Sequence, residues 1–148
     1  MAVSPSFFAV TFSVKVRGLD TLLSQLDALP EKIEPAITRG LTIAASEAVE
    51  QIQSSISESY PPESVPGMPP HLRTGALRAS VRIERVEPMR VTMAVGGPGS
   101  MVPYASYLEF GTSEIEPRPF IVPVIERIKD GIPNIILEEV NKELDKSL

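Results

Sequence analysis

The longest regular pattern in the chain is a stretch of helical spacing from Glu31 to Ser59. Its apolar residues recur every three or four positions, which places isoleucine, leucine, valine and alanine side chains on one face. Gly40, Ala44 and Ala48 form a stripe of small residues on that face. A helix of this length must bury its apolar face against a second layer of structure. The small residues would let that layer, a sheet or another helix, approach closely.

A proline-rich segment follows the predicted helix and ends it. Residues 60–70 hold five prolines and one glycine, so neither a helix nor a central strand can run through them. We therefore expect a semi-rigid, extended arm or loop over about residues 60–73. Such a segment has little means of pairing its own backbone, and we expect it to be mobile in an isolated subunit.

Alternation of polar and apolar residues predicts a small amount of β-structure. One strand is expected from Ala9 to Arg17, and a hairpin is expected with strands at about 79–87 and 90–96. The alternation slips by one residue at Arg85, which indicates a β-bulge. The predicted sheet is therefore small and antiparallel.

The remaining apolar spacing predicts three more helices. They are a short leucine-rich helix over 19–29, a short helix or turn over 104–110 that a glycine ends, and a C-terminal helix from Phe120 onwards. Gly131 and Pro133 should kink or split the last one. The chain of 148 residues is thus expected to be one α+β domain. In it, the N-terminal strand and the hairpin form a small antiparallel sheet packed against a long central helix and a kinked C-terminal helix.

Side chains suited to catalysis or metal binding do not form a recognisable set. The chain has no cysteine, and its only histidine, His71, lies in the proline-rich segment. A catalytic base needs an orienting partner, and a metal needs several ligands at a fixed spacing. Glu109, Glu114 and Glu116 could suggest a carboxylate pair for glycoside hydrolysis, yet nothing sets them apart from the other acids. We expect no catalytic residue, no metal and no cofactor.

Charge is unevenly distributed along the chain. The overall net charge of −5 argues against a general nucleic-acid-binding protein. Residues 19–60 hold seven acids and two bases, whereas residues 61–103 hold three acids and five bases. These five bases could pair with acids of a neighbouring subunit, form a solvated face or contact phosphates, and the acidity of the whole chain favours the neighbouring subunit. All five are arginines: Arg73, Arg78, Arg82, Arg85 and Arg90. No apolar run approaches the ~20 residues that span a bilayer.

Three segments, taken together, resemble one family of phage proteins. They are Thr74-Gly75-Ala76-Leu77-Arg78-Ala79-Ser80-Val81, then Tyr104-Ala105-Ser106-Tyr107-Leu108-Glu109-Phe110-Gly111-Thr112, and Arg118-Pro119-Phe120-Ile121-Val122-Pro123. Their order and spacing are similar to those of the minor tail or tail-completion (neck) family of long-tailed bacteriophages, which includes proteins similar in role to the lambda tail-completion protein. The resemblance spans roughly residues 10–145.

The resemblance implies a structural virion subunit of the head–tail joint and no enzymatic activity. Such a subunit would assemble as a homo-oligomeric ring, with a hexamer as one candidate, between the head–tail connector and the tail terminator or tail tube protein. DNA would pass through its channel without specific binding, and no membrane would be involved. Assembly would take place in the cytoplasm of the host bacterium.

The alternative function is a phage-encoded binding or regulatory module that acts as a monomer or dimer. The size of the protein in solution separates the two functions.

The motif residues are candidates for local structure or for contacts between subunits. Thr74 can cap a turn over Gly75–Leu77, and the aromatic-rich segment Tyr104–Phe110 is expected to dock into the core or into a subunit interface. Glu109 lies between apolar residues and is a candidate partner for Arg78 or Arg118. The full set is Thr74, Gly75, Leu77, Arg78, Tyr104, Tyr107, Glu109, Phe110, Gly111, Thr112, Arg118, Pro119 and Phe120.

Opposite charges supply a second set of interface candidates. A ring uses heterologous contacts, so each subunit must carry two different and complementary faces. The predicted hairpin carries Arg82 and Arg85, and the predicted long helix carries Glu47 and Glu50. We expect the basic hairpin of one subunit to face these acids on the next subunit or on another neck protein.

Overall fold

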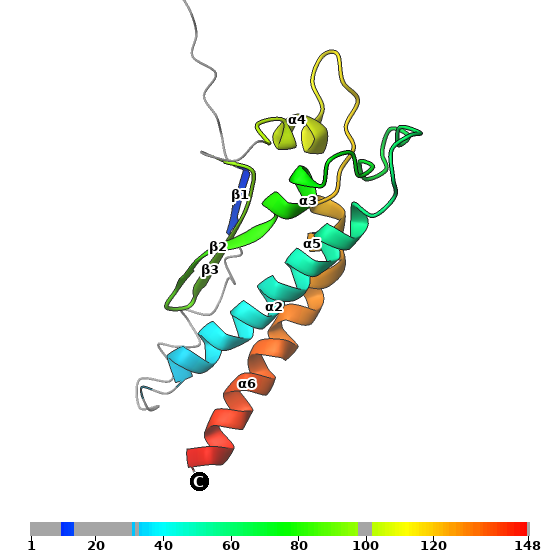
Figure 1. Cartoon of the computed structure of the whole chain (residues 1–148). Coiled ribbons are helices and arrows are strands. Elements are labelled where there is room, and N and C mark those ends of the chain that lie inside the picture. The colour runs from blue at the N-terminus through cyan, green and yellow to red at the C-terminus, as the bar shows by residue number, and fades with distance from the viewer. Residues whose placement is uncertain (1–9, 14–30, 32, 98–101, 148) are drawn as a thin grey trace, which may run out of the picture.

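The computed structural model describes residues 10–13, 31, 33–97 and 102–147, and over these residues the chain is α+β, as predicted (Figure 1). The predicted helix over residues 19–29 lies outside the described residues, and the predicted first strand is described only over Val10–Ser13. The elements are β1 (Val10–Ser13), α2 (Ile33–Ser55), α3 (Ala76–Ser80), β2 (Arg82–Glu87), β3 (Arg90–Val95), α4 (Ala105–Phe110), α5 (Val122–Ile128), the 3-10 turn η1 (Lys129–Gly131) and α6 (Ile132–Ser147).

The sheet has three strands in the order β1-β3-β2, and both pairings are antiparallel. The predicted hairpin and its bulge are confirmed, because the register of β2 against β3 shifts between Ile83 and Arg85. The expected start of the hairpin at residue 79 is wrong, since residues 76–80 form the short helix α3. Gly75, at a φ of 82°, begins a helical turn there that the alternation from Ala79 onwards does not reveal.

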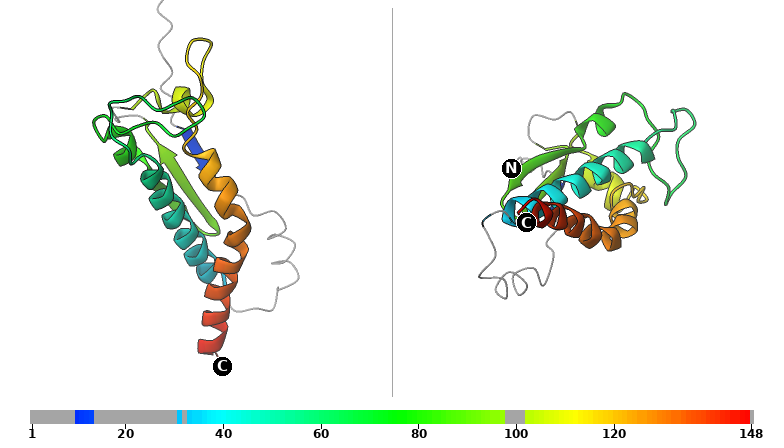
Figure 2. Two further views of the ribbon diagram at one scale, coloured as in Figure 1. Left: turned by 90° about the vertical axis from the view of Figure 1, so that its right-hand side faces the viewer. Right: turned by 90° about the horizontal axis from the view of Figure 1, so that it is seen from below.

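Helix α2 is the central support of the fold, and its apolar face is buried as predicted. One face of the sheet packs on α2, and α6 lies beside α2 (Figures 1 and 2). Val91 from β3, Leu41 from α2 and Ile132 from α6 belong to one buried cluster. The small-residue stripe also has the predicted role, because a Cβ atom on Gly40 would lie only 2.7 Å from the Cα atom of Ile136 in α6. The helix ends at Ser55, four residues before the expected end.

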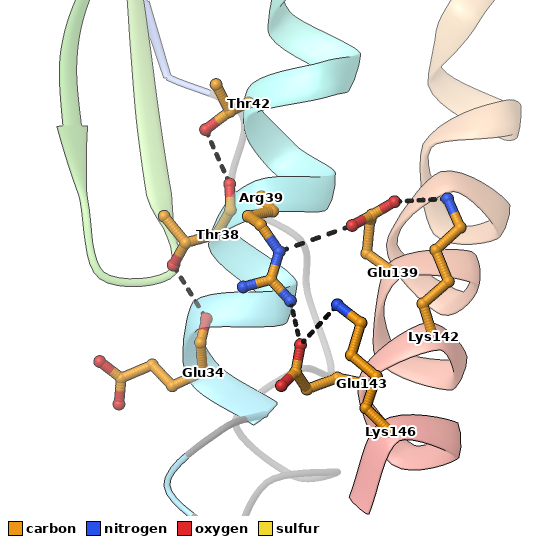
Figure 3. A network of polar contacts seen from close by, with 8 residues as sticks. All are labelled: Glu34, Thr38, Arg39, Thr42, Glu139, Lys142, Glu143 and Lys146. Atoms are coloured by element: carbon orange, nitrogen blue, oxygen red, sulfur yellow. Dashed lines mark hydrogen bonds and ion pairs between the residues drawn. The ribbon is translucent and has the colours of Figure 1, made fainter.

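The C-terminal helix is split where the sequence predicts. Gly131 ends the turn η1, and Pro133 lies in the first turn of α6, where its missing N–H costs little. Arg39 of α2 forms ion pairs with Glu139 (3.5 Å) and Glu143 (2.6 Å) of α6 (Figure 3). The hydrogen bond from Lys142 lowers the pKa of Glu139 below its ordinary value. The Arg39 side chain is 45% exposed, so these pairs align the two helices more than they stabilise them.

A second buried cluster lies at the other end of α2. Phe120 and Ile121, which are fully buried, pack there with Ile52 of α2, Leu77 of α3 and Ala105 of α4. The cluster therefore holds side chains from all three motif segments. Within the part of the chain that the structure describes, no helix has both the length and the apolar character needed to cross a membrane.

The proline-rich arm is tied down by backbone hydrogen bonds. The N–H of Tyr60 donates to the carbonyl of Leu72 (3.0 Å), and the N–H of Leu72 donates to the carbonyl of Glu58 (2.6 Å). Further along, the N–H of Gly67 donates to the carbonyl of Pro117 (2.9 Å). The expectation that the arm has little means of pairing its backbone is therefore wrong, because its non-proline residues donate N–H groups to carbonyls within the arm and beside it.

Candidate functional site

The three motif segments meet at one end of the molecule, far from the C-terminus (Figure 1). We call this region the α4 end and define it as residues 60–80 and 104–120. It contains the arm, α3, α4 and the loop that leads from α4 to α5.

Glu109 holds α4 against the start of α5. Its side chain is buried, with 3% of the residue exposed. The carboxylate accepts hydrogen bonds from the N–H groups of Phe120 (2.8 Å), Ile121 (3.0 Å) and Val122 (2.8 Å). These groups start a helix and have no partner within it, and a negative charge is favoured at this position. The expected pairing with Arg78 or Arg118 is wrong, since backbone N–H groups satisfy the carboxylate.

Gly111 and Thr112 form the tight turn after α4. The N–H of Gly111 donates to the carbonyl of Tyr107 (2.8 Å) and ends the helix, as predicted. With a φ of 73°, position 111 favours glycine, and a Cβ atom there would lie 2.8 Å from the carbonyl oxygen of Ile115. The hydroxyl of Thr112 accepts hydrogen bonds from the N–H groups of Glu114 (3.1 Å) and Ile115 (3.0 Å). Both residues therefore shape the backbone of the α4 end.

Arg118 connects the arm to α4. Its guanidinium donates to the hydroxyl of the buried Ser64 (2.6 Å) and lies 3.9 Å from Glu63. Its backbone N–H donates to the carbonyl of Leu108 (2.6 Å). Ser64 is a contact residue that the sequence did not reveal, because nothing distinguishes it from the other serines nearby.

The Thr74–Arg78 segment has the predicted capped turn. The hydroxyl of Thr74 accepts a hydrogen bond from the N–H of Ala76 (3.3 Å), and Leu77 is a buried residue of α3. Arg78, by contrast, is exposed. Of the motif residues in this segment, only Arg78 thus has a charged side chain directed to solvent.

Large apolar side chains are concentrated on the surface of the α4 end. Tyr104, Tyr107 and Phe110 are 40%, 54% and 62% exposed. The sequence analysis left two alternatives for this segment, docking into the core or into a subunit interface. Because these three side chains are exposed, the first alternative is wrong for them. Seven of the eleven exposed large hydrophobic residues among the described residues belong to this end: Tyr60, Val65, Met68, Tyr104, Tyr107, Phe110 and Ile115. The arm residues in this set, and Ile115, were not among the sequence candidates, although Tyr60, Val65 and Met68 stand out as large apolar residues in a proline-rich segment.

An apolar groove of about 450 Å³ lies between the arm, α3, α4 and the loop after α4. Arg73 lies at this groove, and its guanidinium carbon is 4.3 Å from the centre of the Tyr60 ring. The apolar lining includes Ile56, Tyr60, Leu72, Leu77, Leu108 and Ile115. The α4 end therefore presents both projecting aromatic side chains and a hollow with an apolar lining.

Comparison with known families identifies the class of protein that has this site. The family model for the tail component gp10 of bacteriophage HK97 matches residues 20–111, which is more than half of the chain. The chain belongs to this family of bacteriophage tail components. No curated protein and no solved structure matches it.

The family match stops within the α4 end of this tail component. It includes α2, the arm, the hairpin and α4, and it ends at Gly111. The third motif segment, which begins at Arg118, lies beyond the match. Because Glu109 bonds to the N–H groups of Phe120–Val122, the matched region and the following helix form one structural unit here.

The charged interface candidates of the tail component differ in how freely they can bind a partner. Arg82 donates to the carbonyls of Ser80 (3.1 Å) and Gly96 (2.9 Å), so its guanidinium is used within its own subunit. The side chain of Arg85 is 68% exposed, and its contact to Glu87 is long, at 3.8 Å. Arg90 is exposed as well, and so are the acids Glu47 and Glu50 on α2.

The candidates for catalysis in the tail component are either held by local contacts or exposed. The Nδ1 atom of His71 lies 2.6 Å from the carbonyl oxygen of Pro62, and its Nε2 atom lies 3.3 Å from Glu58. Glu109 is occupied by three N–H groups, whereas Glu114 and Glu116 are exposed. Within the described ranges, no group of three His, Asp or Glu residues could hold a metal ion.

Proposed function

We propose that this tail component is a structural subunit of the head–tail joint. Copies of it would assemble as a ring between the head–tail connector and the tail terminator or tail tube protein. The observation that carries this proposal is the concentration of exposed apolar side chains on the α4 end. Monomeric proteins rarely leave large apolar patches uncovered, and a braced backbone suits a permanent contact between subunits.

The motif residues support this proposal through the rigidity they give to the α4 end. Glu109, Gly111 and Thr112 use their polar groups or backbone conformation to fix the turn between α4 and α5. Arg118 and Ser64 join the arm to the same turn. A surface on such a scaffold changes little on binding, so it loses little conformational entropy when a neighbouring subunit covers it.

The uneven charge distribution would orient the subunits within the ring. Arg85 and Arg90 are the exposed arginines of the hairpin, and we propose that they face Glu47 and Glu50 of the next copy. Arg82 would act indirectly, by fixing the end of the hairpin through its bonds to Ser80 and Gly96. Exposed ion pairs add little affinity, so these charges would set the register and the choice of partner.

The net charge of −5 also suits a channel that DNA crosses without binding. Acidic side chains that are left unpaired in the ring would repel the phosphates and let the genome slide. In this proposal the subunit has no catalytic activity and needs no cofactor. It would assemble in the cytoplasm of the host bacterium.

Charge reversal tests how the copies meet. Arg85→Glu combined with Arg90→Glu is expected to leave the subunit folded and to reduce assembly at low salt, because like charges would then face each other across the contact. Adding Glu47→Lys and Glu50→Lys should restore part of the assembly. Native mass spectrometry measures the assembled fraction, and circular dichroism checks the fold. Unchanged assembly of the arginine double variant across a range of salt concentrations would contradict this arrangement.

A second candidate function rests on the groove. Its volume of about 450 Å³ lies in the range of small-molecule sites, which favours a phage-encoded binding or regulatory module acting as a monomer or dimer. Size in solution discriminates between the two functions. Large closed assemblies favour the head–tail joint, and a stable monomer that binds a small molecule favours the module.

A further inference from the structure

We propose that Tyr107 and Phe110 of one copy insert into the apolar groove of the next copy. This inference rests on the proposed ring, because it names the two surfaces through which the ring subunits would meet. We call the pair Tyr107 and Phe110 the aromatic knob. The groove is the hollow of about 450 Å³ at the α4 end described above.

The faces of α4 show why a subunit does not fill its own groove. Residues three or four apart in a helix share a face. Tyr104 and Leu108 line the groove, whereas Ala105 and Glu109 are buried. Tyr107 lies three residues from both Tyr104 and Phe110. Tyr107 and Phe110 are exposed, and neither of them lines the groove. The knob therefore lies outside the core and outside the lining of its own subunit's groove. In this inference the knob of another copy occupies the groove.

The groove has the size and the lining that an aromatic knob requires. Its volume of about 450 Å³ lies near the lower end of the range for pockets that bind drug-sized ligands, and two aromatic side chains are of comparable size. Ile56, Leu72 and Leu77 contribute apolar walls. Aromatic anchors in apolar pockets dominate the energetics of many protein interfaces.

Arg73 provides a more specific reason for an aromatic occupant. One face of its planar guanidinium lies over the Tyr60 ring, with the carbon 4.3 Å from the ring centre. A guanidinium can stack on aromatic rings through both of its faces. Among the described residues, Arg73 has its cation–π contact with Tyr60, and its guanidinium also forms an ion pair with Glu63 (3.2 Å). An aromatic ring from the neighbouring subunit would complete this stack.

Because the knob and the groove are different surfaces, the inference also predicts how successive copies are joined. Each copy would donate its knob to one neighbour and receive a knob from another. Such a heterologous contact closes as a ring or continues as a filament, whereas in an isologous dimer two copies would insert their knobs into each other's grooves. The inference thus agrees with a ring, and the number of copies in the assembly separates the ring from a dimer that exchanges knobs reciprocally.

Engineered cysteines test the contact directly, because the natural chain has none. Phe110→Cys and Ile115→Cys, both at exposed positions, are placed on separately tagged full-length chains that are co-expressed and then oxidised with copper phenanthroline. A disulfide requires Cβ atoms about 4 Å apart. We expect a cross-linked dimer of one chain of each kind on a non-reducing gel. Leu137→Cys, an exposed apolar position on α6, is the matched control and should not cross-link to Phe110→Cys.

The other outcomes overturn the inference in distinguishable ways. If native mass spectrometry detects rings of the co-expressed cysteine variants but the mixed disulfide is absent, the inference fails while the proposed ring stands. If Phe110→Cys cross-links mainly to itself, or if native mass spectrometry detects dimers and no larger assembly, the inference is wrong. If the wild-type chain stays monomeric at all concentrations, both the ring and the inference are wrong. Insertion of the knob into a different tail protein would appear as rings without the mixed disulfide.

Discussion

Replacing Glu109 with alanine is expected to lower the free energy of unfolding by about 3 kcal/mol. Its carboxylate accepts hydrogen bonds from the N–H groups of Phe120, Ile121 and Val122. Leaving a buried donor without a partner costs about 1–3 kcal/mol. Val122 is exposed, so water can replace the carboxylate at one of the three groups. Urea denaturation followed by circular dichroism measures the change.

Two matched variants test whether Glu109 stabilises the fold by capping the N–H groups at the start of α5. Glu109→Gln keeps one oxygen but directs an NH₂ group at a backbone donor, so we expect a loss of about 1–2 kcal/mol. Glu116→Ala removes an exposed carboxylate from the neighbouring loop and should change stability by less than about 0.5 kcal/mol. A Glu109→Ala variant as stable as Glu116→Ala would contradict the capping role.

Alanine at position 40 is expected to lower the free energy of unfolding by about 2 kcal/mol. The new Cβ atom would lie 2.7 Å from the Cα of Ile136 and 3.2 Å from its Cγ1. Because the nearest atom belongs to the backbone of α6, the side chain cannot relieve the clash by changing rotamer. The two helices must move apart, and overpacking of this kind costs about 1–3 kcal/mol.

Gly131→Ala is the matched control for Gly40→Ala, and its expected effect has the opposite sign. A Cβ atom at position 131 would meet nothing within 4 Å, and Gly131 lies in the short turn η1. Alanine there should raise the free energy of unfolding by about 0.5–1 kcal/mol, because it restricts the unfolded chain. Thermal denaturation of both variants measures the difference. A Gly40→Ala variant that is as stable as Gly131→Ala would show that α2 and α6 do not pack as described.

Local patterns in the sequence predicted most of the fold. The bulge near Arg85 follows from a slip in the alternation of polar and apolar residues. The break at Gly131 follows from a helix-breaking pair, and the close approach at Gly40 follows from a small residue on an apolar face. The buried positions of α2 followed from helical periodicity. Such features depend on a few neighbouring residues, and these are visible in one sequence.

The partners of the polar residues could not be predicted in the same way. A buried Glu109 can be satisfied by an arginine or by backbone N–H groups, and only the tertiary structure decides between them. Arg82 likewise bonds to carbonyl groups at Ser80 and Gly96, which no sequence pattern marks as acceptors. In the arm, the N–H of Gly67 donates to the carbonyl of Pro117, which is far away in the sequence. Each of these contacts depends on which distant segments the fold brings together.

The motif residues of this tail component therefore divide into two groups. Glu109, Gly111, Thr112 and Arg118 build the α4 end. Tyr107 and Phe110 from the same segment are exposed and contribute little to that framework. Variants of the first group should act through folding, and variants of the second group should act through assembly.

Electron microscopy of phage particles made without this chain tests its place in the virion most directly. If the chain is a structural subunit of the head–tail joint, cells that lack it should accumulate filled heads and separate tails. Supplying the wild-type chain should restore complete particles. Joined, infectious virions in normal numbers without the chain would contradict this account.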